Sequence, residues 1–590
     1  MCRRLRYSRM RSADALGRHR IFLKPTILLC RSLTEHSQCA RVHGDDCAKL
    51  YFVRNEGNAM RSNLGTFATA LLASAFATAA WSQGLGRVNF ETSCTPLAQE
   101  KFDRGLAMVH SFFYPDSVQA FTEATAADPQ CAIAYWGIAI SHRPNPMILP
   151  LTSTILKNGL EAVEKGKAIG AKTERERDWL AAIEFYYKDY DKIDQTQRGL
   201  AYEKAMEALM QKYPDDPEAA IFYALALNET ALHSDKTFAN QLKAGAILEK
   251  IEAKLPDHPG VLHYLIHTYD YPTLAQRGLD AANRYAEVAP AAQHAQHMPA
   301  HTYSMLGMWT QSVASNTKSR AVAQGQAAKL WPGATHPGEP HHLDFMEYAL
   351  LQMGQERPAK QLRDDSNAIK KLGFEYLASY TALAAVPARF ALERQAWNEA
   401  AALEPRGSKF PQAEAITHFA RAMGSARGGD LAAAERDVDN LKVIRATLEN
   451  ASQSYWASQV EIQMLAASAW IAQAKGEKET ALKLMRATAD LEDDSEKHIA
   501  MENRLYPMRE LLGDLLLEQQ QPGLALAEYE TSLVSTPNRL RGLYGAAKAA
   551  KAANQPEKAT TYFRKLAEMT KDADTDRVEI SEAKASLMQQ

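Results

Sequence analysis

From about residue 84 to its end, the chain repeats hydrophobic positions with the spacing of an α-helix. Apolar residues return every three or four positions along almost all of this length, which places them on one face of a helix. We find no convincing run of strand-forming residues. The pattern predicts an all-α protein. Because 590 residues exceed one ordinary hydrophobic core, we expect several domains or a repeat array.

A longer period of about 34 residues overlies the helical one. Small residues, an aromatic residue and a proline return at fixed places within it. The clearest frames contain Gly513, Ala525, Tyr529, Ser532 and Pro537, and then Gly105, Phe121, Ala124 and Pro129. Small residues let two helices of a hairpin approach, the aromatic ring fills the gap to the next hairpin, and proline ends the second helix. We therefore predict a superhelical solenoid of antiparallel helix pairs.

The chain thus resembles tetratricopeptide-repeat (TPR) proteins over most of residues 98–570. More narrowly, it is similar to an exported bacterial family of such proteins that has no firmly assigned activity. The segments that carry this resemblance are Cys131–Gly137, His258–Gly260 with His263–His267, and His297–His301 with Leu306–Trp309. The resemblance implies a fold and a compartment, but it does not imply a reaction.

Breaks in the repeat pattern indicate domain boundaries. Pro/Gly-rich segments at Trp331–Pro340 and Glu404–Pro411 interrupt the array. The predicted parts are N-terminal repeats over 94–330, central repeats over 341–403, C-terminal repeats over 412–570 and a capping helix or tail over 571–590.

The N-terminal segment differs in composition from the rest. Residues 1–59 carry twelve basic and five acidic residues, and Met60 and Arg61 then precede an uncharged, Ala-rich run from Leu64 to Ala80. This order is typical of a secretory signal. We interpret 1–59 as a non-native upstream extension and 60–83 as a signal peptide, which predicts a periplasmic or secreted protein. The alternative, an uncleaved membrane anchor, fits less well because the run is short.

Two cysteines remain after the predicted cleavage, Cys94 and Cys131. In an oxidising compartment such a pair suggests a disulfide, which would be worth roughly 3–4 kcal/mol by chain entropy. The alternative is two buried free thiols.

Histidines are concentrated in one part of the chain. Nine of the 17 histidines lie between His258 and His342. His263 and His267 form one row at helical spacing, and His294, His297 and His301 form a second row. We expect helices over 260–269 and 292–308, as the first helices of adjacent hairpins. Pro299 suits a first helical turn, so the second helix could begin near His297 and leave His294 in the preceding loop.

The two rows predict a metal site. His263 and His297 are one repeat period apart, so equivalent positions would lie side by side, about 10 Å apart between helix axes. His263, His267, His297 and His301 could then supply four nitrogens to zinc. His294 or Asp270 would be a further ligand or would orient one. Copper is the rival ion. The alternative is that each ring packs separately and bonds to its own partner.

Other residues near the rows admit two interpretations. His341, His342 and Asp344 could reach over the concave face, although polar surface residues at the start of a repeat are the simpler interpretation. Trp136, Trp309 and Trp331 fit gaps between hairpins better than a ligand platform.

No sequence motif assigns a reaction. HExxH, a phosphate-binding glycine loop and GxSxG are absent, so catalytic residues stay unknown. Residues 84–590 hold 55 basic and 65 acidic residues, which argues against a nucleic-acid partner. We also expect no stable membrane insertion once the signal is removed.

Three hypotheses remain. The first is an exported scaffold that binds a protein or peptide in its concave groove. The second is a metal-binding or metal-handling protein. The third is a metal-dependent hydrolase, with Asp270, Glu287 or Asp344 as the base.

Overall fold

The computed structural model describes residues 84–143, 145–147, 151–232, 234–495, 498–501 and 503–588. Every named element in this part of the chain is a helix, and a single β-bridge joins Thr335 to Leu372. The all-α prediction is therefore confirmed. The predicted upstream extension and signal peptide lie outside the described residues.

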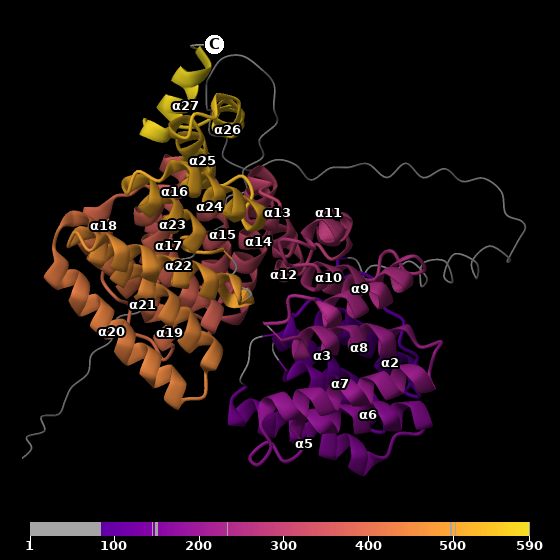
Figure 1. The fold of residues 1–590 in the computed structure, drawn as a ribbon. Coiled ribbons are helices and arrows are strands. Elements are labelled where there is room, and N and C mark those ends of the chain that lie inside the picture. Colours follow the sequence, from indigo (N-terminus) through magenta and orange to yellow (C-terminus); the bar gives the residue numbers. More distant parts are fainter. Residues whose placement is uncertain are drawn as a thin grey trace, which may run out of the picture. The chain divides into compact units, whose positions relative to one another are not determined.

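The first helices run along the chain from residue 96 to residue 288. They are α2 (Pro96–His110), α3 (Tyr114–Ala127), α4 (Ile133–Ser141), α5 (Ser153–Ile169), α6 (Glu174–Tyr187), α7 (Gln195–Lys212), α8 (Pro217–Thr230), α9 (Ala239–Glu252), α10 (Pro259–Thr268), η1 (Ala275–Gly278) and α11 (Leu279–Val288). Figure 1 shows consecutive helices of this set lying side by side. Their buried side chains form one hydrophobic cluster, which extends from Phe90 to Tyr303.

The middle helices follow, between residues 293 and 401. They are α12 (Gln293–His297), α13 (Pro299–Met305), α14 (Trp309–Leu330), α15 (Glu339–Gln352), α16 (Glu356–Ala368), α17 (Leu377–Glu393) and α18 (Trp397–Ala401). The Pro/Gly-rich segment 331–340 joins α14 to α15, and the segment 404–411 lies between α18 and α19.

The last helices complete the array. They are α19 (Pro411–Gly428), α20 (Leu431–Asn450), α21 (Ser454–Ala474), α22 (Lys478–Asp493), η2 (Ile499–Met501), α23 (Met508–Glu518), α24 (Pro522–Ser535), α25 (Leu540–Ala552), α26 (Pro556–Met569) and α27 (Val578–Met588). A second large hydrophobic cluster extends from Leu377 to Ala559. In the terminal segment, α27 buries Ile580 and Ala583.

The helices pair through the contacts that the 34-residue pattern predicts. The Phe121 ring of α3 lies against Gly105 of α2 and Gly137 of α4, where an added Cβ would stand 3.0 and 2.3 Å from it. Tyr529 of α24 repeats the arrangement between Gly513 and Gly545, at 2.8 and 2.3 Å. At both places an aromatic ring thus fills the space between one helix pair and the next. This is the packing of a TPR-like helical solenoid.

Side-chain caps mark the start of several helices. Thr173 and Glu176 form a reciprocal capping box at the start of α6, and Asp194 and Asp216 cap α7 and α8 with their side chains. Such caps satisfy backbone N–H groups that have no partner inside the helix.

Contacts also join helices that are far apart in the sequence. The Trp309 indole donates to the backbone oxygen of Asn538 over 2.9 Å. Asp574 accepts from the backbone N–H of Glu356 over 2.7 Å, and the backbone N–H of Leu540 donates to Gln352 over 2.9 Å. The C-terminal helices therefore pack against the middle of the chain as well as against their neighbours.

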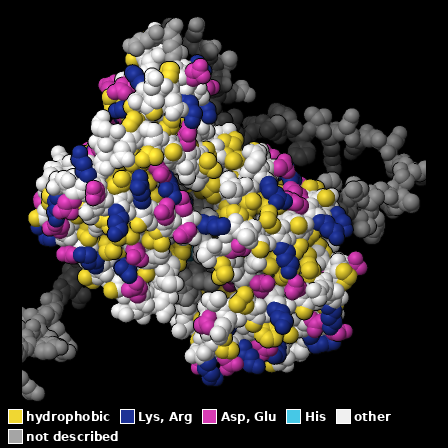
Figure 2. Space-filling model, viewed as in Figure 1, with side chains coloured by type: hydrophobic (Ala, Val, Ile, Leu, Met, Phe, Trp, Pro, Cys, Tyr) yellow, Lys and Arg dark blue, Asp and Glu magenta, His cyan; other side chains and the backbone are white. Residues whose placement is uncertain are grey.

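The surface shows mixed chemistry. On the face seen in Figure 2, hydrophobic side chains are interspersed with basic and acidic ones. Within the described residues, no helix combines the length and the apolar character needed to cross a membrane.

Candidate metal centre

The histidine-rich helices are short because prolines punctuate them. His258 caps α10 by accepting from the backbone N–H of Val261 over 3.4 Å, and Pro259 occupies the first turn. The predicted helix over 292–308 is two helices, α12 and α13, because Pro299 begins a new helix directly after Met298. A proline nitrogen cannot donate to the preceding turn, so α12 ends at His297. His294 therefore lies in a helix, and its prediction in a loop was wrong.

The five histidines of the two rows lie close together, but they do not share one centre. His263, His267 and His294 form one group and His297, His301 and His341 form another, each with one ligand atom per residue within 4.8 Å of the others. The four ligands predicted for a single ion are thus divided between two groups. His294 completes the first group, and His341 of α15, which the repeat spacing did not place there, completes the second.

The two groups adjoin. Ring centroids of His267 and His301 are 6.1 Å apart, and those of His294 and His297 are 6.0 Å apart. His342 also lies beside the second group, with its ring 5.1 Å from that of His297. The side chains form one continuous cluster of imidazoles drawn from α10, α12, α13 and α15.

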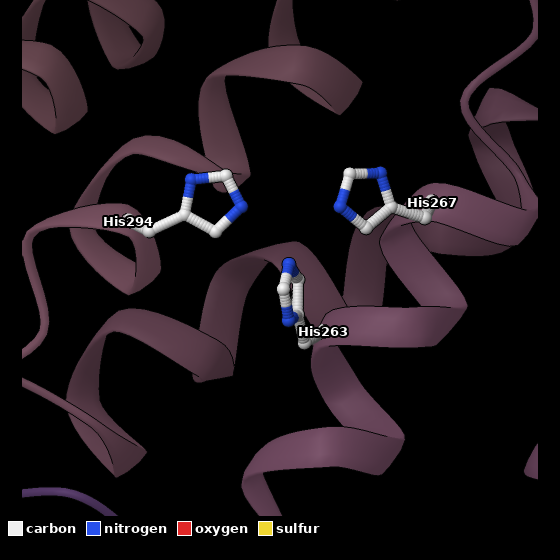
Figure 3. A group of neighbouring side chains, drawn as sticks. All are labelled: His263, His267 and His294. Carbon is white, nitrogen blue, oxygen red and sulfur yellow. The ribbon is translucent and has the colours of Figure 1, made fainter. Parts of the chain in front are cut away.

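In the first group, a backbone contact fixes the orientation of one ring. His263 Nδ1 lies 2.6 Å from the carbonyl oxygen of His110, so Nδ1 carries the proton and Nε2 keeps its lone pair. His263 Nε2 and His294 Nε2 are both buried without a hydrogen-bond partner among the described residues. Figure 3 shows the rings of His263, His267 and His294 turned toward one another.

In the second group, two oxygen atoms fix the rings. His301 Nδ1 lies 2.8 Å from an Asp270 carboxylate oxygen, and His297 Nδ1 lies 2.6 Å from the Asn316 amide oxygen. The orientation of Asn316 is set because its NH₂ group donates to Ser312 over 2.9 Å. Both Nδ1 atoms therefore carry protons, and in the neutral rings both Nε2 atoms hold lone pairs.

These two Nε2 atoms face each other at 3.0 Å. Two nitrogen lone pairs at this distance repel, and either a shared proton or a metal ion between them would turn the contact into an attractive one. Two nitrogens bound to one zinc at about 2.0–2.1 Å, with angles of about 90–110°, stand about 2.9–3.4 Å apart. The observed separation falls in that range.

Burial favours the uncharged form of three of these histidines. It lowers the pKa of His263 to about 3, and burial, followed by the proximity of other histidines, holds the pKa of His294 and His297 well below the ordinary value. Neutral imidazoles are the form that binds metal ions.

The three carboxylates that could act as the base of a hydrolase lie in different surroundings. Asp270 faces His301, as a residue that orients a metal-binding histidine would. Asp344 is buried and paired with Arg389, and Glu287 is exposed. His342 and Asp344 are both buried, so the interpretation of the 341–344 segment as polar surface was wrong. Long-range packing of α15 buries them.

A third group of ligand-type side chains has a different character. His110 and His258 each donate from Nε2 to a Glu218 carboxylate oxygen over 2.9 Å, and His110 Nδ1 lies 3.1 Å from the Tyr264 hydroxyl. Hydrogen bonds occupy the nitrogens of these two rings. We interpret this group as a buried polar network that holds the His110 carbonyl against His263.

Trp136, Trp309 and Trp331 lie in three different places. Trp136 is fully buried and stacks near Phe90, and Trp309 packs on Tyr348. Trp331 lines a cavity that histidines of both groups also line.

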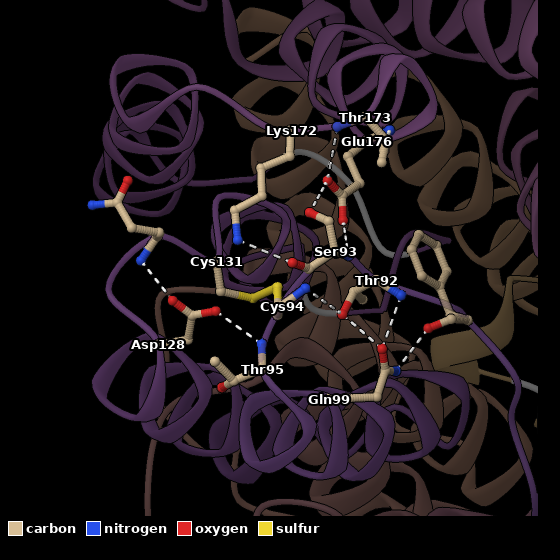
Figure 4. The surroundings of a disulfide bond; sticks show 12 residues. Thr92, Ser93, Cys94, Thr95, Gln99, Asp128, Cys131, Lys172, Thr173 and Glu176 are labelled. Atoms are coloured by element: carbon tan, nitrogen blue, oxygen red, sulfur yellow. Dashed lines mark hydrogen bonds between the residues drawn. A yellow bond between two sulfur atoms is a disulfide. The ribbon is translucent and has the colours of Figure 1, made fainter.

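The two cysteines lie near the start of the array. Cys94 precedes α2, Cys131 precedes α4, and the structure joins them by a disulfide with Cα atoms 5.0 Å apart. Polar contacts surround the bridge in Figure 4: the backbone N–H of Thr95 donates to Asp128 over 2.9 Å, and that of Ser93 donates to Glu176 over 2.6 Å. The bond ties the segment before α2 to the start of α4.

Comparisons with known proteins identify no family. No protein-family model and no curated protein matches the chain. Similar solved structures include that of Naa15/Naa10 bound to HypK-THB, with 13% identity, a TM-score of 0.23, and coverage of 84% of this chain and 91% of that chain. Two others are the human IFIT1 dimer with m7Gppp-AAAA (11% identity, TM-score 0.34, covering 75% and 90%) and with PPP-AAAA (11%, 0.35, covering 75% and 91%). The fold assignment rests on the helix packing described above.

Proposed function

We propose that this protein is a metal-binding helical-repeat protein whose histidine cluster holds two transition-metal ions, zinc or copper. One observation carries the proposal: His297 and His301 direct two lone-pair nitrogens at each other across 3.0 Å. His341 adds a third nitrogen to this pair. Three imidazoles and no thiolate are a ligand set that suits zinc and copper.

The first group supports a second ion. His263 and His294 each bury an Nε2 atom without a hydrogen-bond partner among the described residues. Leaving a buried acceptor unsatisfied costs about 1–3 kcal/mol, and one ion shared with His267 would remove that cost for both atoms. Oxygen atoms hold His263, His297 and His301 at Nδ1, as is common for metal-binding histidines.

Export belongs to the same proposal. The signal-like sequence at 60–83 and the disulfide between Cys94 and Cys131 both suit a periplasmic or secreted protein, because disulfides persist in oxidising compartments.

Metal binding is better supported than hydrolysis. A metal-dependent hydrolase needs a base beside the ion. Asp270 is hydrogen-bonded to His301, Asp344 is paired with Arg389, and Glu287 is exposed. A protein or peptide partner bound to the helical array is compatible with metal binding and remains a separate proposal. The mixed surface in Figure 2 favours no single partner site on that face.

Elemental analysis of protein purified without chelator tests the proposal. We expect up to two zinc or copper ions per chain. His301→Ala should remove one ion by opening the second group, and His263→Ala should remove one ion by opening the first group. His142→Ala is the matched control, because His142 lines the same cavity but belongs to neither group. A metal-free protein, or equal metal content in all three variants, would contradict the proposal and favour a proton shared by His297 and His301.

A further inference from the structure

A cavity of about 530 Å³ opens onto the histidine cluster. Its lining includes His294 of the first group and His297, His301 and His341 of the second group, together with His342. An ion in the second group would therefore face a space large enough for a small molecule. Small-molecule sites typically combine such a concave space with a few converging polar groups.

Aromatic side chains form one wall of the cavity. Trp331 lies 5.7 Å from Phe374, and Phe374 lies 6.2 Å from Tyr376, measured between ring centroids. Phe112, which also lines the cavity, stacks on His294 of the first group at 5.3 Å. Phe374 remains 47% exposed, although large apolar side chains are usually covered in a folded protein.

Backbone contacts and close packing hold this wall in place. The backbone N–H of Thr335 donates to Lys371 over 2.9 Å, and the N–H of Gly373 donates back to Thr335 over 3.0 Å. The Trp331 ring lies directly over Gly373, where an added Cβ would come within 2.5 Å. These contacts join the segment after α14 to the segment before α17. A wall held by such contacts needs little ordering to accept a ligand, which lowers the entropy cost of binding.

Apart from the ion itself, the lining that the structure describes offers no positive charge to an anion. Among the described lining residues, Glu375 is the one carboxylate, and lysine and arginine are absent. The remaining polar groups include Ser141, Asn145 and Gln293, which are uncharged. A carboxylate or phosphate on the body of the ligand, apart from its metal-binding atom, would find no cationic side chain there, whereas a neutral aromatic body would meet rings that it can stack on.

Resting on the proposed function, we infer that this cavity binds a neutral, mainly aromatic small molecule with one metal-binding oxygen or nitrogen. That atom takes the open coordination position of the ion held by His297, His301 and His341. Zinc bound by three protein ligands keeps such a position. The aromatic body of the ligand then lies against Trp331, Phe374 and Tyr376.

Titration of cobalt-loaded protein with 4-phenylimidazole tests the inference. Cobalt(II) reports a change of its ligands in its visible spectrum, and imidazole supplies the same donor without the aromatic body. We expect 4-phenylimidazole to bind at least about ten times more tightly than imidazole, because only it buries a phenyl ring. Phe374→Ala should weaken 4-phenylimidazole about fivefold and imidazole less than about twofold, with unchanged cobalt content.

The controls separate this inference from the proposed function. Phe185 is also exposed, at 53%, but lies on α6 outside the cavity, so Phe185→Ala should bind both probes as the wild type does. Equal affinities for the two probes, or no effect of Phe374→Ala, would overturn the inference while leaving the metal site intact. Tighter binding of a probe with a carboxylate on its phenyl ring would also overturn it. Failure to take up cobalt would instead contradict the proposed function.

Discussion

At the scale of single residues, the chemistry depends on which nitrogen of each ring is protonated. Asn316, Asp270 and the His110 carbonyl each hold one Nδ1. The sequence predicted that His297 and His301 would share one helical side, and it suggested Asp270 as an orienting residue. The roles of Asn316 and of the His110 carbonyl could not be predicted, because 153 residues separate His110 from His263 and only tertiary packing brings them together.

His336 provides a residue-scale prediction that concerns pH. Burial lowers its pKa to about 4, and its Nδ1 accepts from the backbone N–H of Gly338 over 3.0 Å. In the unfolded chain His336 binds a proton near pH 6.5, whereas in the folded protein it does so only near pH 4. Neutral His336 therefore favours folding above about pH 6.5, and this contribution is lost as the pH falls toward about 4, by roughly 1.4 kcal/mol per pH unit.

Urea unfolding of chelator-treated protein at about pH 7 and about pH 5 measures this effect. His336→Gln should lose about 2 kcal/mol less of its free energy of unfolding between the two pH values than the wild type does. Equal losses would show that His336 is protonated with similar ease in both states.

At the scale of helices, the repeat pattern predicted packing well where it was regular. The rings of Phe121 and Tyr529 fill the gaps assigned to them, and each lies against the expected glycine. The prediction was less accurate in the degenerate middle of the array, where Pro299 divides one expected helix into α12 and α13. His341 joined the second group for a reason that no local pattern contains, since α15 packs on α13 and α14.

Two glycine substitutions test the role of the gap-filling ring. In Gly545→Ala the new methyl group would stand 2.3 Å from the Tyr529 ring, so we expect a loss of about 1–3 kcal/mol in the free energy of unfolding. Gly523 of α24 has nothing within 4 Å of its added Cβ, and Gly523→Ala should stabilise the helix by up to about 1 kcal/mol. Hydrogen exchange over α23–α25 should become faster in the first variant only. Equal protection in both variants would contradict this account of the packing.

At the scale of the whole molecule, the array does more than stack each helix pair on the next. The repeat frames predict contacts between neighbours, yet Trp309 bonds to Asn538 and Glu356 bonds to Asp574. The histidine cluster likewise draws on α10, α12, α13 and α15. Ions bound there would join the end of the first hydrophobic cluster to the middle helices, so metal and fold should stabilise each other.

X-ray absorption spectroscopy of the metal-replete protein tests the central claim most directly. It reports the kind, number and distance of the atoms around each ion. We predict about three imidazole nitrogens per ion at about 2.0–2.1 Å for zinc, with the outer-shell scattering of histidine rings and no sulfur. A protein that holds no ion after loading, or an ion surrounded by oxygen or sulfur without imidazole scattering, would contradict the claim.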